Sequence, residues 1–224
     1  AGIQPDAVTY TTLMNAAIQT KNSARAFQLF DAMRESGIQP DAITYTTLMN
    51  AAIQTGKSTR AFQLLDSMKA AGIQPTAVSY TTLMNAAIQT SNNERAFQLF
   101  DAMREADIQP TAVTYTTLMN AAIQTKDSTR AFHLFDIMRE ASIHPTAVTY
   151  TTLMNAAAQT GNNERAFGLF DAMREAGIQP TAVTYNTLMN MANHTGNNEC
   201  AFELFDIMRE AGIQPTAVTY NTLI

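Results

Sequence analysis

The sequence predicts an all-α fold, a superhelical α-solenoid of stacked antiparallel helical hairpins. Two observations predict it: the chain repeats itself every 35 residues, and each repeat holds two stretches with helical periodicity. The seven tyrosines and the seven prolines all recur at this spacing. Residues 7–41 and 147–181 differ at only seven of 35 positions. A single hairpin cannot bury both of its apolar stripes, but stacked neighbours can, so the repeats are expected to form one continuous array.

The first half of each repeat is predicted to be an amphipathic helix, running roughly from residue 7 to residue 20 in the first copy. Its apolar stripe has the spacing of one helix face and consists of Tyr10, Leu13, Met14 and Ala17. Asp6, which follows Pro5, supplies the start. Proline disfavours helix for the residue before it, and Asp or Thr after the proline is a good N-cap, worth about 1 kcal/mol.

The second half is predicted to be another helix, from about Ser23 to Ser36, after a polar turn at residues 21–23. Its stripe consists of Ala26, Leu29, Phe30 and Met33, and the phenylalanine and methionine stripes are expected to form the core. In later copies Asn-Asn-Glu begins this helix, with a carboxylate in its first turn. Gly37 is expected to end the helix in the left-handed conformation. Asp107 and Ser142 replace this glycine in two repeats, at a small expected cost in stability.

The repeats define a single array over residues 1–224, without separate domains or linkers. Residues 1–6 are expected to end a preceding repeat, and residues 217–224 to begin a seventh. The six full repeats are 7–41, 42–76, 77–111, 112–146, 147–181 and 182–216. Since the chain begins and stops inside a repeat and shows no targeting segment, we expect an excerpt of a longer array or an engineered array. Open apolar ends make end-to-end self-association an expected consequence.

Composition argues against several classes of function. The net charge of −5 does not suggest a strongly basic nucleic-acid binder, and one cysteine excludes an internal disulfide framework. No apolar run is long enough to span a membrane. His133, His144 and His194 occupy three different places in their repeats, so no metal site is expected, and Cys200 stands where other repeats have arginine. Without a nucleophile, paired-carboxylate or phosphate-loop motif, we expect no enzyme and no cofactor.

Three motifs recur in every repeat: V-T-Y-[TN]-T-L-M near its start, A-F-x-L-F-D-x-M in its middle and G-I-Q-P-[DT] at its end, with small departures. Over essentially the whole chain, this pattern resembles the pentatricopeptide repeat family. The resemblance implies a right-handed superhelical α-solenoid of stacked antiparallel helical hairpins that binds single-stranded RNA, one base per repeat, in mitochondria or chloroplasts. One base per repeat is physically reasonable, because unstacked bases expose their Watson–Crick edges to side chains.

The resemblance also assigns roles to three positions in each repeat. The aliphatic residue two before the tyrosine would sandwich the bases; these residues are Val8, Ile43, Val78, Val113, Val148 and Val183. The residue after the tyrosine would meet the base edge; these residues are Thr11, Thr46, Thr81, Thr116, Thr151 and Asn186. The residue after the proline, the last of the repeat, would complete the base contact; these residues are Asp41, Thr76, Thr111, Thr146, Thr181 and Thr216.

The resulting pairs predict a site of about six nucleotides. By analogy with the family, Thr11 with Asp41 favours guanine, because a carboxylate accepts hydrogen bonds from the N–H groups of that base. The four Thr–Thr pairs are expected to favour purines weakly, leaning to adenine, since a hydroxyl both donates and accepts. Asn186 with Thr216 is expected to favour a pyrimidine. The site then has guanine first, four purines and a pyrimidine last.

Simpler interpretations of the same residues stay open. The residue after the proline is also a plain N-cap, and the valines could be packing residues. In addition, the first helix of every repeat carries no Asp, Glu, Lys or Arg; glutamines such as Gln19, and finally His194, stand near its end. Since phosphate neutralisation supplies much of the affinity for RNA, binding is expected to be weak. The alternatives are a scaffold for protein interactions and an engineered, purely structural helical-repeat array.

Overall fold

A computed structural model describes residues 5–223 and contains thirteen α-helices and no strand in that range. The first helices of the repeats are α1 (Ala7–Gln19), α3 (Ala42–Gln54), α5 (Ala77–Gln89), α7 (Ala112–Gln124), α9 (Ala147–Gln159), α11 (Ala182–His194) and α13 (Ala217–Leu223). The second helices are α2 (Ser23–Glu35), α4 (Ser58–Ala70), α6 (Asn93–Glu105), α8 (Ser128–Glu140), α10 (Asn163–Glu175) and α12 (Asn198–Glu210). The predicted helices in the first repeat are confirmed to within one residue at each end.

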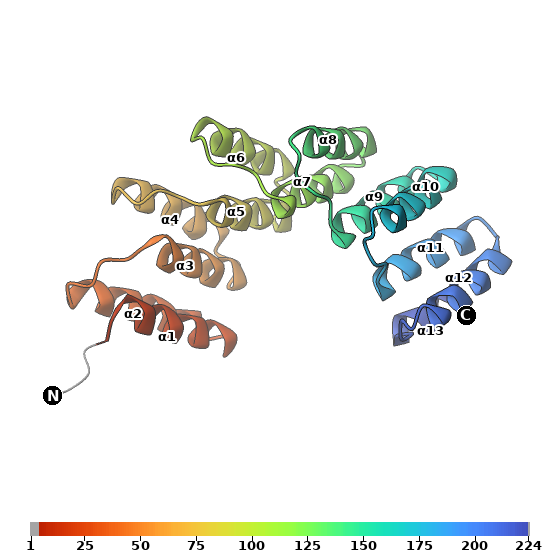
Figure 1. The fold of residues 1–224 in the computed structure, drawn as a ribbon. Helices are drawn as coiled ribbons and strands as arrows, with labels where there is room; N and C mark the ends of the chain where they lie inside the picture. Colours follow the sequence, from red (N-terminus) through yellow and green to blue (C-terminus); the bar gives the residue numbers. More distant parts are fainter. Residues whose placement is uncertain (1–4, 224) are drawn as a thin grey trace. The chain divides into compact units, whose positions relative to one another are not determined.

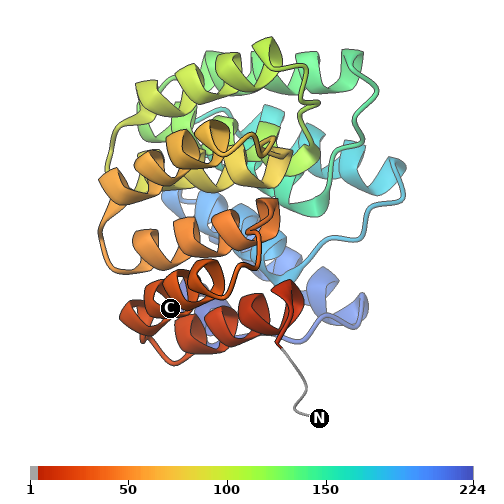
Figure 2. The ribbon, with the colours of Figure 1, turned by 90° about the vertical axis from the view of Figure 1, so that its left-hand side faces the viewer.

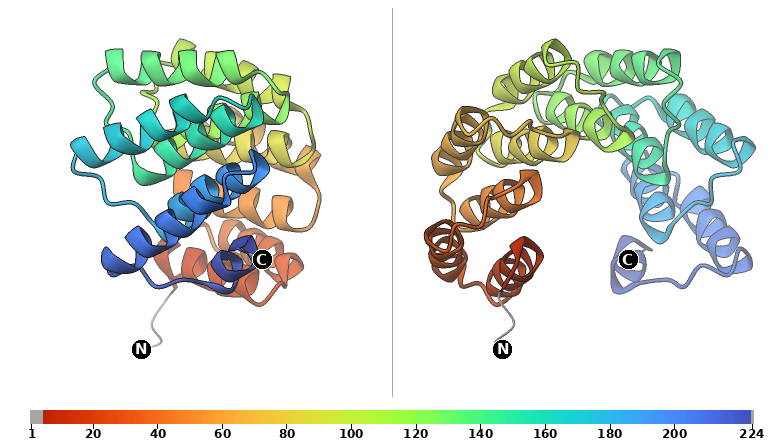
Figure 3. Two further views of the ribbon diagram at one scale, coloured as in Figure 1. Left: turned by 90° about the vertical axis from the view of Figure 1, so that its right-hand side faces the viewer. Right: turned by 60° about the vertical axis from the view of Figure 1, so that its left-hand side comes forward.

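The helices form antiparallel hairpins in chain order, which confirms the expected all-α hairpin fold (Figure 1). The chain divides into two compact parts, residues 1–114 and 115–224, and the division falls inside α7. In the first part α1 packs on α3 and α3 on α5, while α2, α4 and α6 each pack on their own hairpin partner (Figure 2). The second part repeats this arrangement with α9, α11 and α13, paired with α10 and α12 (Figure 3).

The core lies between the two helices of a hairpin and the first helix of the next. The predicted methionine stripes are confirmed: Met33, Met68, Met103, Met138, Met173 and Met208 are all 0% exposed. In the first, fourth, fifth and sixth repeats, the phenylalanine of the second helix packs edge-on against the next tyrosine. The centroids of Phe30 and Tyr45 are 5.6 Å apart, and those of Phe170 and Tyr185 are 5.5 Å apart. Such edge-to-face pairs are favourable beyond the area they bury.

Phe202 departs from the predicted core, since its side chain is 53% exposed. The equivalent Phe132 is covered by the guanidinium of Arg165 from the next second helix, whose Cζ lies 3.2 Å from the ring centroid. No second helix follows Phe202 among the described residues, so its ring has no such cover. The position in the array, rather than the local pattern, decides the burial of this ring.

A residue with a left-handed backbone conformation lies shortly before and shortly after each second helix. Gly37 has φ +74° and follows α2 as expected, and its neighbour Ile38 donates a main-chain hydrogen bond to the carbonyl of Met33 at 3.0 Å. Asp107 and Ser142 adopt the same conformation, with φ 57° and 58°. The turn between α1 and α2 also contains a residue in this left-handed conformation, Lys21, with φ 58°. That second requirement was not predicted from the sequence.

Besides Phe202, the C-terminal end exposes Ile207 and Tyr220, whose side chains are 42% and 53% exposed. If the predicted self-association occurs, the apparent mass should rise with concentration, because burying these groups is favourable. Sedimentation velocity over a hundredfold concentration range tests this expectation. A strictly monomeric sample at the highest concentration would contradict it and leave the hairpin fold unaffected.

None of the helices in the described range is long and apolar enough to cross a membrane.

Candidate nucleic-acid interface

The first helices present one exposed face that is the same in every full repeat. The aliphatic residue two before the tyrosine is exposed throughout, from 63% for Val113 to 72% for Val8. Seven and eleven residues later, on the same side of the helix, stand an exposed asparagine and, in five repeats, an exposed glutamine, as in Asn50 and Gln54 of α3. The valines are therefore not core packing residues, which answers one of the simpler interpretations.

A groove runs along this face in the C-terminal part of the chain. It has a volume of about 680 Å³ and crosses α7, α9 and α11. Its walls include the asparagines Asn120, Asn155 and Asn190, with Gln159 and His194 beside them. This row of asparagines was not predicted from the sequence, although asparagine recurs there every 35 residues, at a position outside both apolar stripes. The equivalent residues of the other repeats are Asn15, Asn50 and Asn85.

The residue after the proline lies at the N-terminus of each first helix, where it is exposed and caps the helix. In α3, Asp41 accepts hydrogen bonds from the main-chain N–H of Thr44 and from its hydroxyl, both at 2.8 Å. In α5, Thr76 accepts from the N–H of Ser79 at 3.3 Å. Asp6 caps α1 in the same way, and the hydrogen bonds from the hydroxyl and the N–H of Thr9 lower its pKa. The predicted N-cap role is confirmed in each case.

The residue after the tyrosine is buried, at 6–9% exposure in the six full repeats. Its hydroxyl donates to the main-chain carbonyl four residues earlier: Thr46 donates to Ala42 at 2.7 Å, and Thr151 donates to Ala147 at 2.8 Å. A threonine hydroxyl has one proton, so this bond uses the only one it has. The predicted base-edge threonines thus sit beneath the exposed surface rather than on it.

A third residue connects the two predicted base-edge positions. This is the threonine or serine just before the tyrosine of the next repeat, and it is 0% exposed at every such site. The hydroxyl of Ser79 lies 2.8 Å from that of Thr46 and 3.2 Å from that of Thr76. Thr184 joins Thr151 and Thr181 at 3.0 and 3.2 Å. A residue of the next repeat therefore connects the two residues that the family resemblance paired within one repeat.

The sixth repeat differs at this site. Asn186 replaces the buried threonine and is 8% exposed, and its Oδ1 atom is buried without a hydrogen-bond partner. An unsatisfied buried carbonyl oxygen is unusual, because it forfeits its hydrogen bonds to water. This oxygen lies at a position that the sequence assigned to base contact.

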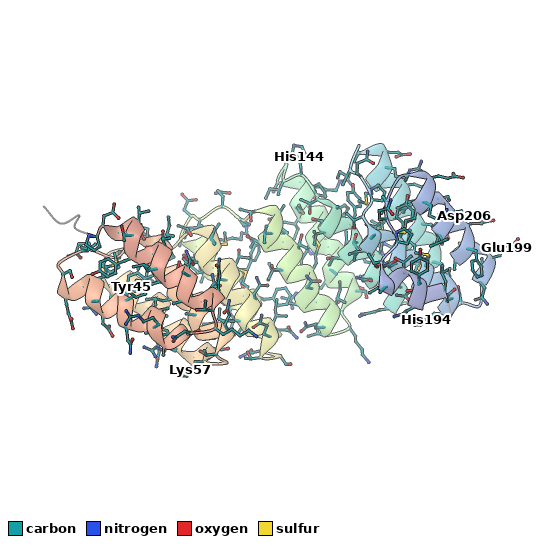
Figure 4. The ribbon with its side chains drawn as sticks, turned by 90° about the horizontal axis from the view of Figure 1, so that it is seen from below. Tyr45, Lys57, His144, His194, Glu199 and Asp206 are labelled. Atoms are coloured by element: carbon teal, nitrogen blue, oxygen red, sulfur yellow. The ribbon has the colours of Figure 1, made fainter. Side chains whose placement is uncertain are left out.

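The first helices carry no Asp, Glu, Lys or Arg; the charges lie in the capping Asp6 and Asp41, the turns and the second helices. Lys126, in the turn after α7, lines a hollow together with Gln159 of the exposed face. In Figure 4, Lys57 lies at the edge of the first part, in the turn between α3 and α4. His144 and His194 lie at opposite edges of the second part in the same view (Figure 4). No group of three His, Cys, Asp or Glu residues placed to hold a metal ion is found in residues 5–223.

Three family profiles match the chain. The profile described as the PPR repeat family matches residues 5–54, and that described as a pentatricopeptide repeat domain matches residues 35–87. The profile described as the pentacotripeptide-repeat region of PRORP matches residues 85–224. A comparison with curated proteins gave no match.

Among solved structures, the pentatricopeptide repeat protein PPR10 from maize is similar over 99% of this chain and 32% of its own, with 30% identity and a TM-score of 0.64. PPR10 in complex with an 18-nt psaJ RNA element matches over 99% of this chain and 36% of its own, at 26% identity and TM-score 0.64. The PPR domain of Arabidopsis thaliana protein-only RNase P 1, in complex with tRNA, has the same fold at 19% identity (TM-score 0.63, 78% of this chain, 92% of its own). The chain spans about a third of the length of the PPR10 chains.

Proposed function

Because the chain belongs to the pentatricopeptide repeat family, we propose that it is a single-stranded RNA-binding module that contacts one base per repeat. The observation that carries this proposal is the repeated arrangement at each repeat boundary. An exposed aliphatic side chain, a capping residue and a buried residue after the tyrosine recur together every 35 residues, and one hydroxyl links the last two. This regularity suits a ligand that is itself a regular chain of flat, hydrogen-bonding groups.

The similarity to PPR10, which was solved with an 18-nt RNA element, supports RNA as the ligand. The RNA sequence predicted from the residue pairs consists of a guanine, four purines with a preference for adenine, and a pyrimidine. The module would act by occupying the transcript and supporting its processing, without catalysis of its own. A mitochondrial or chloroplast location belongs to the same proposal and rests on the family alone.

Selection from a randomised single-stranded RNA pool tests the proposal. We expect recovery of a motif of about six bases with guanine at its 5′ end and a pyrimidine at its 3′ end. The same pool as duplex RNA is the control and should be bound more weakly, because its base edges are paired. If no motif is recovered, or if duplex RNA is bound with equal affinity, the chain does not recognise individual bases. The uncharged face would then favour the protein scaffold.

The affinity should depend only shallowly on salt. The first helices of all six full repeats carry no lysine or arginine, and their exposed face is made of valine, asparagine and glutamine. We expect about one or two phosphate contacts, and for single strands each contributes about −0.7 to the slope of log K against log salt. Filter binding of the selected RNA across a range of KCl concentrations measures this slope. A slope of about −4 or steeper would require a basic track on another face.

A further inference from the structure

In the second to fifth repeats, the hydroxyl groups at the boundary with the next repeat form a chain, and its protons have one order when each contact is a hydrogen bond. In the second repeat, Thr46 donates its proton to the carbonyl of Ala42 at 2.7 Å. The 2.8 Å contact between Ser79 and Thr46 therefore uses the proton of Ser79. Since that proton is then used, the 3.2 Å contact between Thr76 and Ser79 uses the proton of Thr76.

Consequently the exposed Thr76 points its proton inward and has no donor left for a ligand. Its oxygen also accepts from the N–H of Ser79 at 3.3 Å, so about one lone pair faces outward. The same order holds for Thr181, Thr184 and Thr151 in the fifth repeat, where the two hydroxyl contacts are 3.2 and 3.0 Å and Thr151 donates to Ala147 at 2.8 Å.

The first repeat provides an internal comparison, because Asp41 stands in place of the threonine. A carboxylate only accepts, so Thr44 donates to Asp41 at 2.8 Å while Thr11 donates to Ala7 at 2.8 Å. No proton remains between Thr11 and Thr44. Their oxygens are 3.3 Å apart, against 2.8–3.1 Å for the corresponding pairs in the next four repeats. The longer distance agrees with the proton count.

We propose that in the second to fifth repeats, which end in threonine, the buried hydroxyl just before the next tyrosine is a positioning residue for base selection: it holds the proton of that threonine inward, so that the threonine only accepts from a base. The positioning residues are Ser79, Thr114, Thr149 and Thr184. Thr219 is not one of them, because Asn186 has no hydroxyl to receive its proton. The inference rests on the proposed function and adds residues that the base-edge pairs do not include.

The positioning residue would act by removing one of the two hydrogen-bonding roles of the threonine hydroxyl. A free hydroxyl rotates to donate to one base and to accept from another, and so distinguishes them poorly. A hydroxyl whose proton is fixed only accepts, like the carboxylate of Asp41, so it rewards bases that present an N–H group and moves the purine preference of these four repeats toward guanine. Loss of the positioning hydroxyl should therefore flatten the base preference of the preceding repeat more than it lowers the affinity.

The test is Ser79→Ala, which removes one oxygen and adds nothing. Competition binding with six-base RNAs that differ only at the second base gives the ratio of best to worst affinity there. We expect Ser79→Ala to reduce this ratio by roughly two- to tenfold, the value of one hydrogen bond, and to leave the ratios at the other bases unchanged. Ser79→Thr, which restores the residue found in other repeats, should keep the ratio of the natural chain.

Thr44→Val is the matched control for the first base. Because Asp41 has no proton to release, this substitution should leave the preference at the first base intact, although the cap is weakened. If the ratio at the second base survives Ser79→Ala, or if Thr44→Val flattens the first base equally, the inference is wrong. Thr184→Val repeats the test at the fifth base, should Ser79→Ala fail to fold. A natural chain without preference at any base contradicts the proposed function itself.

Discussion

Met84→Ala is expected to lower the free energy of unfolding by about 2–5 kcal/mol, whereas Val78→Ala, in the same helix, should change it by less than about 0.5 kcal/mol. Met84 is 0% exposed, so its truncation leaves a cavity in the middle of the first compact part. Val78 is 64% exposed, and little protein surface loses contact with it. Chemical denaturation followed by circular dichroism measures both.

For RNA binding, we expect the larger effect from Val78→Ala and the smaller one from Met84→Ala. Val78→Ala removes two carbons of apolar surface at a position proposed to sandwich bases, and we expect roughly four- to fifteenfold weaker binding, from about 0.8 kcal/mol for each buried carbon lost. Met84→Ala, measured where it is still folded, should bind with nearly the natural affinity, since its side chain does not reach the surface. If Val78→Ala binds RNA normally, the exposed aliphatic row has no part in recognition.

The elements of this fold were predictable because each depends on short-range physics. A proline followed by Asp or Thr locates the start of a first helix, and the helical spacing of Met33 with its stripe locates the buried face. The residues for base contact came from the family resemblance, and the structure adds that one of each pair is buried and the other exposed. The burial of Thr46 was not predictable from its polarity.

The features that were not predicted depend on how one repeat packs on the next. Periodicity identifies neighbouring repeats but not their offset, and the offset decides whether Ser79 lies within hydrogen-bond distance of Thr46. The same applies to Phe202, whose exposure follows from the absence of a covering helix in the described range and not from its local sequence. The left-handed conformation of Lys21 is not indicated by lysine itself, but the equivalent position is glycine in three other repeats, and those glycines carried the signal.

Asp41→Asn should move the preference at the first base from guanine toward adenine while leaving the fold intact. The cap uses one carboxylate oxygen, Oδ1, which accepts from both the N–H and the hydroxyl of Thr44. An asparagine keeps that oxygen and replaces the other one with an N–H₂ group, which donates where the carboxylate accepted. The change should amount to roughly 1–3 kcal/mol at that base, by analogy with bidentate contacts in DNA grooves.

Asp6→Asn is the control, because it makes the same substitution in the same kind of cap. Asp6 accepts from the N–H and the hydroxyl of Thr9 at 2.8 and 2.7 Å, but no residue after a tyrosine precedes it within the described range to complete a pair. Competition with RNAs that differ only at the first base should therefore separate the two variants.

A shift of the guanine preference in Asp41→Asn alone assigns base contact to this side chain. If neither variant alters it while both keep the natural melting temperature, the residue after the proline is only a helix cap. The protein scaffold then becomes the better account of the exposed face.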